Sequence, residues 1–418
     1  MPEMISLEEA RSLVLSRMEA LPTETVPVLD LAGRVAAADL TSDIDIAPFA
    51  HSAMDGFALR SDQIASASDT SPVELDVIAE IAAGDSFEGS IGEGQCVRIM
   101  TGAPLPADAD TVVKYEVVGV VSGDGRTGSR VSFSAPSAVR NSVREAGEEA
   151  RAGEVIVSQG EVVGAAGVGF LAGCGVTEAP TYRRPRVAII SIGSELVEAH
   201  EVPTPGKIRN SNSYALAATA RAAGAVPTIL PIVEDSLDAL KAAILECTAS
   251  YDFVVSSGGA SNGDFDFIKP AVDQLGELLM TSVNMRPGKA QTFGIVEDVP
   301  VFGLPGNPAA AYLGFEMIIR PALRKMQGYT HFDRPRVTAA LTEDLKKKDT
   351  RRIFTRSTMT KDAEGNYLVT PAKNQSSGLF GVIQRSNCFA VLPEGARQYT
   401  AGELVECILL DVNEEVSL

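Results

Sequence analysis

The sequence predicts an α/β protein of several domains, with a doubly wound, mostly parallel sheet in the central domain and β modules before and after it in the chain. The length of 418 residues is the first reason, because it exceeds what one hydrophobic core usually supports. The second is that strand-like and helix-like segments alternate after residue 186, which is typical of a parallel sheet. The third is that short β-branched runs with many Gly, Ser and Asp residues fill residues 46–148.

Changes in sequence texture divide the chain into four predicted domains. An amphipathic helix opens residues 1–45, which together with the glycine-rich residues 149–182 form an N-terminal helix and linker subdomain. Residues 46–148 form a small β module, and residues 183–330 form the α/β domain. Residues 331–418 lose the helical pattern and show strand-like alternation, which predicts a C-terminal β module.

Within the α/β domain, short apolar runs predict strands and longer apolar segments predict helices. The predicted strands cover residues 187–192, 226–232, 253–256 and 299–302. The predicted helices cover residues 213–223, 237–249 and 309–327. Ligands of such sheets bind beyond the carboxyl ends of the strands, so we expect a site in the loops that follow these strands.

Composition excludes several classes of function. The formal net charge of −19 argues against nucleic acid as a partner, because phosphate backbones need a basic surface. The five cysteines are scattered and only three histidines occur, so we expect no disulfide framework, structural zinc site or histidine-rich metal site. No apolar run is long enough to cross a bilayer and the N-terminus does not resemble a secretory signal, so we expect a cytoplasmic protein.

The loop after the last predicted strand gives the strongest indication of a binding site. It contains Gly303, Pro305, Gly306 and Asn307, and Pro308 opens the helix behind it. A loop of this kind directs several backbone N–H groups at one point, and such groups bind anions.

Neighbouring segments strengthen this prediction. Arg286 and Lys289 place two cations on another glycine-containing turn, so we expect a phosphorylated or oxyanionic ligand. Two further loops, at residues 193–196 and 256–263, follow other predicted strands and are expected at the same edge of the sheet. Each loop alone also fits an ordinary βα turn, but three at one edge favour a binding site. The small residues of the second loop that we expect near the ligand are Ser257, Gly258 and Gly259.

Acidic residues on these loops are candidates for a metal site. Glu195, Asp235 and Asp266 could hold Mg²⁺, because hard cations prefer carboxylate oxygens. The alternative is that each acid only caps a helix or interacts with its dipole. The sequence contains no G-x-G-x-x-G, Walker A or nucleophile-elbow pattern, so we do not expect a dinucleotide-binding fold, a P-loop ATPase or a serine hydrolase.

Six motifs carry a resemblance to a known family: SAMDGFA, RIMTGAPLP, SIGSEL, SSGGASNGDFD, RPGKA and GLPGNPAA. Their order and spacing are similar to those of the MoeA/gephyrin E-domain family of molybdopterin molybdenumtransferases, over nearly the whole chain. The resemblance implies an enzyme that takes adenylylated molybdopterin and molybdate, uses Mg²⁺, and yields molybdenum cofactor and AMP. It also implies an elongated homodimer whose active site lies between the molybdopterin-binding-like α/β domain of one protomer and the β module of the other.

The resemblance also assigns roles to individual residues. Asp55 and Thr101 match the acid and the threonine that the partner protomer contributes in the family. Lys289 matches the second cation of the family's lysine-containing turn. The acidic loop residues tied to Mg²⁺ and the phosphoanhydride are matched by Glu195, Asp235 and Asp266. The positions where the family places groups that contact anions are Arg351, Arg356 and Ser377.

Several positions depart from the family pattern. Arg286 replaces the usual lysine, and Ala310 replaces a serine, which removes a hydroxyl donor near the expected molybdate position. Glu149 replaces an aspartate, and Ile353 replaces a common acid. The departures leave open a second hypothesis, a gephyrin-like dimeric scaffold that binds a membrane-receptor peptide and a tubulin-like cytoskeletal protein with reduced or no catalysis. A generic hydrolase of phosphorylated ligands is a third and weaker alternative, because no clear base or nucleophile is present.

Overall fold

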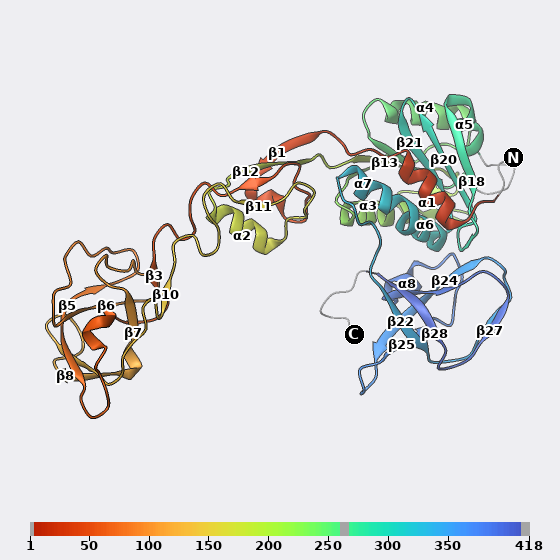
Figure 1. Cartoon of the computed structure of the whole chain (residues 1–418). Helices are drawn as coiled ribbons and strands as arrows, with labels where there is room; N and C mark the ends of the chain where they lie inside the picture. The colour runs from red at the N-terminus through yellow and green to blue at the C-terminus, as the bar shows by residue number, and fades with distance from the viewer. Residues whose placement is uncertain (1–3, 260–266, 411–418) are drawn as a thin grey trace. The chain divides into compact units, whose positions relative to one another are not determined.

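Figure 1 shows the computed structural model of the protein, which describes residues 4–259 and 267–410. The chain forms two compact units, one made of Met1–Glu24 with Tyr182–Leu418 and the other of Thr25–Thr181. We call the first the sheet-and-barrel unit and the second the β-module unit. No helix in the described ranges is both long enough and apolar enough to cross a membrane.

A six-stranded sheet forms the centre of the sheet-and-barrel unit. Its strand order is β16 (Val226–Ile229), β13 (Arg186–Ser191), β17 (Phe253–Ser257), β21 (Val299–Leu304), β20 (Ala290–Val296) and β18 (Glu277–Ser282). The first four strands are mutually parallel, which confirms the predicted sheet, whereas β20 runs antiparallel to both of its neighbours. The tight turn between β20 and β21 places Glu297 and Asp298 at positive φ, where hairpin turns usually carry Asn or Gly. The residue types of this turn therefore do not indicate a hairpin.

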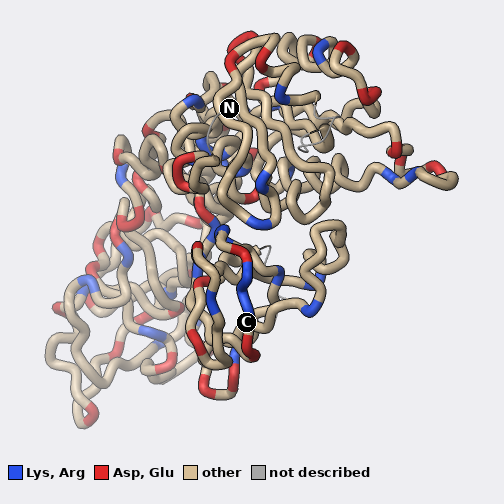
Figure 2. Tube along the Cα trace, turned by 90° about the vertical axis from the view of Figure 1, so that its right-hand side faces the viewer, with Lys and Arg blue, Asp and Glu red and all other residues tan. Residues whose placement is uncertain are grey.

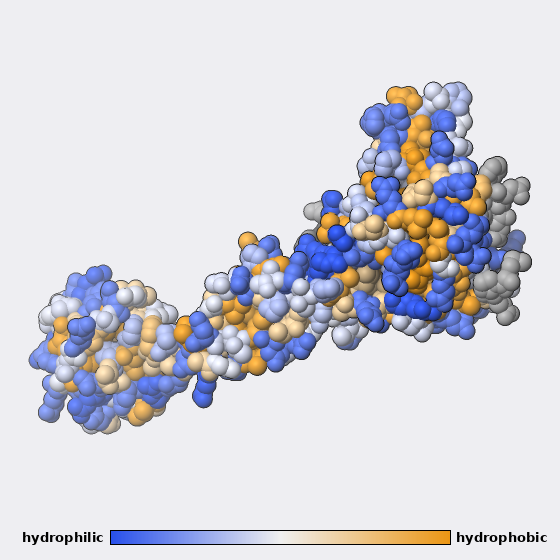
Figure 3. All heavy atoms as spheres, turned by 90° about the horizontal axis from the view of Figure 1, so that it is seen from above, coloured by the Kyte–Doolittle hydropathy of each residue, from blue (hydrophilic) through white to orange (hydrophobic). Residues whose placement is uncertain are grey.

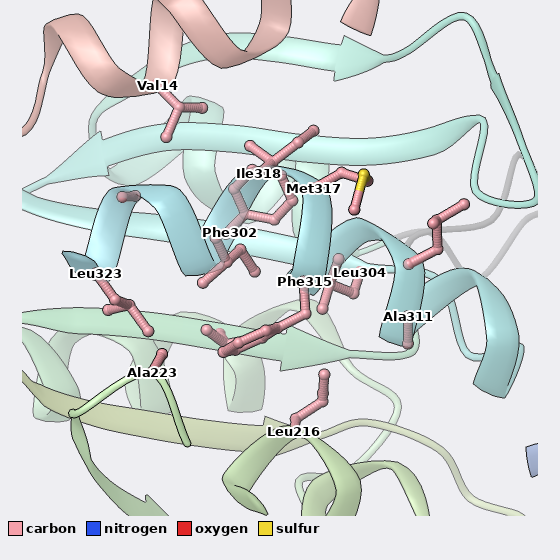
Figure 4. Close-up of a cluster of buried hydrophobic side chains, with 14 of the residues drawn as sticks. Val14, Leu216, Ala223, Phe302, Leu304, Ala311, Phe315, Met317, Ile318 and Leu323 are labelled. Carbon is pink, nitrogen blue, oxygen red and sulfur yellow. The ribbon is translucent and has the colours of Figure 1, made fainter. Parts of the chain in front are cut away.

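Helices cover both faces of this sheet, which confirms the predicted doubly wound arrangement. One face packs on α4 (Leu237–Thr248) and α5 (Ile268–Leu275). The other face packs on α1 (Leu7–Ser16), α3 (Asn212–Ala222) and the helical segment from α6 (Pro308–Gly314) to α7 (Arg320–Met326), as Figure 4 shows. Successive strand residues alternate between the two cores, as the period of two in a strand requires.

The predicted continuous helix over 309–327 is interrupted by a π-helical turn at Phe315–Ile319. Pro321 lies directly behind this turn, and it has no N–H group to donate to the preceding turn, which explains the break in the α-helical pattern. Phe315 within the turn and Phe302 in β21 are fully buried beside each other in the core of Figure 4. Burial of one such side chain contributes about 1.5–3 kcal/mol, so the interrupted helix is still firmly held.

The C-terminal part forms a closed barrel, which confirms the predicted β module. The strands follow one another around the ring as β24 (Arg352–Lys361), β25 (Tyr367–Pro371), β22 (Arg336–Leu341), β28 (Leu404–Leu409) and β26 (Cys388–Leu392), and β26 pairs with β24. A short hairpin of β23 (Leu345–Lys347) and β27 (Arg397–Tyr399) and a helix α8 (Phe380–Gln384), which the sequence did not predict, complete this part. Strand β19 (Met285–Arg286), from the chain segment between β18 and β20, pairs with β24 and so joins the sheet domain to the barrel.

The β-module unit contains a second six-stranded sheet. Its order is β7 (Thr111–Lys114), β4 (Gly56–Leu59), β6 (Gln95–Ile99), β5 (Val73–Ile81), β9 (Arg130–Phe133) and β8 (Val118–Ser122). Short pairs join β1 (Thr23–Pro27) to β12 (Glu178–Tyr182), β2 (Leu40–Thr41) to β11 (Val155–Val157) and β3 (His51–Ser52) to β10 (Val143–Arg144). The unit also contains the helix α2 (Ala165–Gly173). Apolar and hydrophilic side chains are intermixed on its face in Figure 3.

Candidate active site

A cavity of about 810 Å³ lies in the sheet-and-barrel unit, lined by the turn after β19, the start of α6 and the barrel. We call it the cationic cavity, because its lining among the described residues includes seven Lys and Arg side chains and one carboxylate. Along the rest of the trace in Figure 2, cations and acids are intermixed. In a chain of net charge −19, this local excess of cations indicates an anionic ligand. The cations are Arg286, Lys289, Lys346, Lys347, Lys348, Arg351 and Arg356, and the carboxylate is Asp349.

Arg356 on β24 is the most deeply buried cation of this cavity, with 2% of its surface exposed. Its Nη2 donates to the Ser376 carbonyl oxygen at 3.2 Å, whereas its Nε has no acceptor among the described residues. Burial lowers the pKa of the guanidinium, and no carboxylate of the described chain offsets that effect. A buried guanidinium without an anionic partner is costly, and a bound anion would remove that cost.

Asp349 links two other arginines of the cavity. Arg351 donates to it through its backbone N–H at 2.9 Å, its Nε at 3.0 Å and its Nη2 at 2.6 Å. Arg286 donates through Nη1 at 2.8 Å. These hydrogen bonds, the Arg351 side chain first, hold the pKa of the Asp349 carboxyl far below its usual range, although burial opposes them. Asp349 is therefore ionised at all pH values at which the protein is expected to work.

The loop before α6 differs in part from the predicted anion cradle. The Ala309 N–H donates to the Ser377 carbonyl, and the Ala310 and Ala311 N–H groups donate to the Asn307 carbonyl. The first turn of the helix is thus already satisfied. The N–H groups of Gly306 and Asn307, both on exposed residues, have no acceptor among the described residues and stay available.

Gly303 lies inside β21 and not in the loop, which corrects the prediction that it approaches the ligand. It is buried, and a Cβ at this position would lie 2.8 Å from Cγ1 of Ile268 and 3.3 Å from Cβ of Thr292. The glycine is therefore explained by close packing of α5 against the sheet.

The loops after β17 and β21 approach each other at the carboxyl edge of the sheet. Gly258 has a φ of +93°, and a Cβ there would lie 2.2 Å from the Ile192 carbonyl oxygen, so only glycine fits. Asn212 Nδ2 donates to Ser257 Oγ at 2.7 Å and to the Gly306 carbonyl at 2.8 Å. This one side chain therefore ties the two loops together.

A second, smaller cavity of about 70 Å³ lies beside these loops, and we call it the edge pocket. Two amide atoms that line it, Asn210 Nδ2 and Asn212 Oδ1, are buried without a partner among the described residues. The Ser213 N–H donates to Asn210 Oδ1 at 3.3 Å, and the Gly306 carbonyl accepts from Asn212 Nδ2, so backbone groups fix both amide orientations. The edge pocket therefore offers one donor and one acceptor to a ligand or to water.

The acidic loop residues lie near this edge. Glu195 is exposed and lines the edge pocket, and the Ser194 N–H donates to Asp235 Oδ2 at 3.5 Å. Asp266, the third predicted metal ligand, lies outside the described residues. No group of three or more His, Cys, Asp or Glu side chains within residues 4–259 and 267–410 is arranged to hold a metal ion.

Asp55 and Thr101 meet in the β-module unit, as members of one site should. Thr101 donates twice to Asp55 Oδ1, from its backbone N–H at 2.8 Å and from its hydroxyl at 2.7 Å. These two hydrogen bonds, the backbone one first, lower the pKa of Asp55, and the charge of Arg98 acts in the same direction. Both residues are exposed, so the pair presents an ionised carboxylate at the surface of its unit.

The predicted substrate-binding residues fall into two groups. The cationic cavity brings together Arg286, Lys289, Pro305, Asn307, Arg351, Arg356 and Ser377. The edge pocket brings together Ser257, Gly258 and Gly306, with Gly259 next in the chain. Two of the departures from the family pattern, Ala310 and Ile353, also line the cationic cavity, whereas Glu149 is an exposed residue of the β-module unit.

Sequence reasoning missed several residues of both cavities. The run Lys346-Lys347-Lys348 followed by Asp349 is unusually basic for an acidic chain and could have indicated the wall of an anion site. Asn210 and Asn212 stand between a predicted strand and a predicted helix, and only the register of the loops reveals that their amides face a pocket.

Comparisons with known proteins agree with the six motifs. Three family models match: the MoeA N-terminal region (domain I and II) over residues 5–175, a probable molybdopterin binding domain over 188–325 and the MoeA C-terminal region (domain IV) over 338–410. A molybdopterin molybdenumtransferase of Bacillus subtilis (strain 168) is 36% identical over 410 residues, which cover 97% of this chain and 94% of the relative. One of Staphylococcus aureus (strain COL) is 33% identical over 408 residues, which cover 97% and 96%.

A solved structure of the molybdopterin biosynthesis MoeA protein from Pyrococcus horikoshii OT3 superimposes with a TM-score of 0.81 at 26% identity. The superposition covers 98% of this chain and 100% of that one, so the fold is shared throughout. The predicted resemblance is thereby confirmed, and this chain belongs to the MoeA family of molybdopterin molybdenumtransferases.

Proposed function

We propose that this protein is a molybdopterin molybdenumtransferase that takes adenylylated molybdopterin and molybdate and yields molybdenum cofactor and AMP. Membership of the family supports a transferase in molybdenum cofactor biosynthesis. The observation that carries the proposal is the cationic cavity, in which Arg356 is buried without an acidic partner among the described residues. Unmatched positive charge in a recess is what a tetrahedral oxyanion or a phosphoryl group requires.

Within this proposal the two cavities have different roles. The cationic cavity binds molybdate and phosphoryl oxygens, and its cations neutralise the charge that develops as the phosphoanhydride is cleaved. The loops at the edge pocket bind part of molybdopterin, with Ser257, Gly258, Gly259 and Gly306 close to it. Both cavities are lined by the loop before α6, which supports their joint use for one substrate.

We also propose that Mg²⁺ binds at the acidic loops, through Glu195, Asp235 and Asp266. The donor set fits, because a hard cation prefers carboxylate oxygens and keeps several waters. When bound, the ion supplies positive charge next to the phosphoanhydride. Binding of Mn²⁺, followed by electron paramagnetic resonance, tests this without turnover, and the variants Glu195→Gln and Asp235→Asn should each weaken it. Unchanged Mn²⁺ affinity in both variants would contradict the assignment.

A homodimer is a further part of the proposal, because Asp55 and Thr101 match residues that the family takes from a partner protomer. The test is to mix D55N subunits with subunits that carry Arg356→Met after controlled dissociation. If the two defects lie in different subunits of one site, about a quarter of the sites become intact on random pairing. Persistent inactivity of the mixture, with hybrid dimers demonstrated by mass spectrometry, would argue against a shared site.

The decisive experiment is the release of AMP from adenylylated molybdopterin in the presence of Mg²⁺ and molybdate. We expect AMP to appear with saturable dependence on molybdate, and the product to activate a molybdoenzyme freed of its cofactor. A folded protein that releases no AMP across a molybdate titration would contradict the proposed activity.

The scaffold hypothesis gains no support from the comparisons. The two curated relatives reported above are named as transferases, and the solved structure as a biosynthesis protein. Binding of a membrane-receptor peptide or a tubulin-like protein stays a prediction from the resemblance, as does the cytoplasmic location.

A further inference from the structure

We propose that Asp349 is the specificity-determining residue of the cationic cavity: a built-in anion that the ligand must displace from Arg286, so that carboxylates are excluded and tetrahedral dianions are admitted. This inference rests on the proposed function, because it concerns the same cavity. It concerns a residue that neither the six sequence motifs nor the predicted site contains.

The Asp349 carboxylate accepts hydrogen bonds from Arg351 and Arg286, as the oxyanion of a ligand would. Its side chain is 13% exposed and accepts four hydrogen bonds, three from Arg351 and one from Arg286. A carboxylate held by the side-chain fork of an arginine is the usual geometry of oxyanion recognition in proteins. The free cavity is therefore partly neutralised by the protein itself.

The two arginines are not held equally. Arg351 is two residues away in the chain, is 26% exposed and forms three of the contacts. Arg286 reaches Asp349 from β19 through one hydrogen bond at 2.8 Å, and its side chain is 56% exposed. Arg286 is therefore the member of this triad that an incoming anion can take over, while Asp349 stays paired with Arg351.

This exchange discriminates between ligand classes. A free carboxylate offers Arg286 no more than Asp349 already does, and Asp349 has the advantage of being attached to the chain. A tetrahedral dianion carries twice the charge and has further oxygens, which can accept from the unpaired Nε of Arg356 in the same cavity. Asp349 thus acts as a repulsive element against the wrong ligands as well as a partner for the arginines.

The first test is Asp349→Asn, which keeps the size of the side chain and removes its charge. Molybdate and formate binding are measured by isothermal titration calorimetry on the full chain, with Glu343→Gln as the control. Glu343 is exposed on the same barrel outside the cavity, so the control removes the same charge elsewhere. We expect the preference for molybdate over formate to fall at least about tenfold in D349N and to stay unchanged in E343Q.

A ratio in D349N equal to that of the wild type would overturn the inference. A second measurement needs no variant. In crystals of the wild-type protein soaked with tungstate, Arg286 Nη1 should lie beyond about 4 Å from Asp349 and contact the tungstate. An Arg286–Asp349 bond that persists beside bound tungstate would equally contradict the exchange. Failure of the wild-type protein to bind either tetrahedral anion would count against the proposed function itself.

Discussion

The two cavities of the sheet-and-barrel unit are built from different kinds of polar group. The cationic cavity uses long side chains, among them Arg356 and Lys346, drawn from the barrel and from the turn after β19. The edge pocket uses backbone groups and short polar side chains at the end of a parallel sheet, held in place by Asn212. The first is therefore expected to respond to the charge of a ligand and to salt, and the second to its shape and hydrogen-bonding pattern.

The two cavities also differ in the free energy that their unsatisfied polar atoms cost. The edge pocket leaves two neutral amide atoms unsatisfied, which water can bridge at small cost. The cationic cavity contains a buried guanidinium, that of Arg356, with no carboxylate partner among the described residues, and its one contact with a neutral carbonyl cannot compensate the charge fully. Under the proposed function this guanidinium lowers the stability of the fold and favours the binding of an anion, so substitutions in the cationic cavity should change stability and anion affinity separately.

The largest effect is expected for Arg356→Met, which keeps much of the buried volume and removes the charge. Loss of charge-assisted hydrogen bonds worth about 1.5–3 kcal/mol should weaken molybdate binding about 100-fold. The melting temperature should stay the same or rise, because the arginine has no acidic partner among the described residues to leave unpaired. Calorimetric titration with molybdate and thermal unfolding by circular dichroism measure the two properties on the same sample.

Arg352→Met is the matched control for that variant. Arg352 lies on the same strand but pairs with Glu8 and Glu394 and does not line the cavity. Its loss should cost stability and leave molybdate affinity unchanged. If R356M retained wild-type affinity, the cationic cavity would not be the oxyanion site.

Asn212→Ala is expected to weaken the binding of a pterin and to leave the binding of molybdate unchanged. The substitution removes both hydrogen bonds that tie the loops after β17 and β21. Binding of 6-hydroxymethylpterin, followed through its fluorescence, should weaken about tenfold, since each lost hydrogen bond contributes about 0.5–1.5 kcal/mol. Molybdate affinity should not change. Ser211→Ala is the control, because Ser211 lines the same pocket and its side chain does not cap α3. Equal loss of pterin and molybdate binding in N212A would mean that the two cavities do not act separately.

The sequence predicts the edge pocket better than the cationic cavity, because the two cavities are built differently. The edge pocket lies at the carboxyl ends of strands that apolar runs such as 253–256 reveal, so Ser257 and Gly258 could be placed from the fold class alone. The cationic cavity depends on β19 pairing with β24, a contact between segments more than sixty residues apart. Arg351 and Arg356 could be named only through the resemblance to a family.

Other features that the sequence did not predict also depend on contacts or turn geometry that no local pattern shows. Asp349 belongs to the site because Arg286 reaches it across the β19–β24 pairing, and no local pattern encodes that. The β20–β21 hairpin was missed because Glu297 and Asp298 occupy a turn that usually carries Asn or Gly. Gly303 was predicted to lie in the binding loop, but it lies in β21, where its lack of a side chain lets α5 pack closely. The sequence alone does not distinguish a glycine of this kind from a loop glycine.

A smaller effect is expected in the β-module unit for Thr101→Val, which removes the hydroxyl donor to Asp55 and keeps the shape of the side chain. The two hydrogen bonds from Thr101 lower the pKa of Asp55, so loss of one raises that pKa towards its ordinary value. The acidic limb of the pH profile of AMP release should move to higher pH. The carboxyl resonance of Asp55, titrated by ¹³C NMR, gives the same information without turnover, and an unmoved resonance would contradict the prediction.

The smallest effect is expected for Ala310→Ser. Unlike the other variants, it adds a polar group to the cationic cavity and removes none. Ala310 is 3% exposed and lines the cationic cavity beside Asn307, so a hydroxyl there would add a neutral donor next to the cations of the cavity. One further hydrogen bond to an oxyanion is worth about 0.5–1.5 kcal/mol, which should raise molybdate affinity about twofold to tenfold. Ala309→Ser is the control, because Ala309 is equally buried but does not line the cavity. A rise in molybdate affinity in A310S but not in A309S would mean that the hydroxyl adds one contact to an existing oxyanion site. The cations of the cavity, Arg356 among them, would then bind the oxyanion even without the serine.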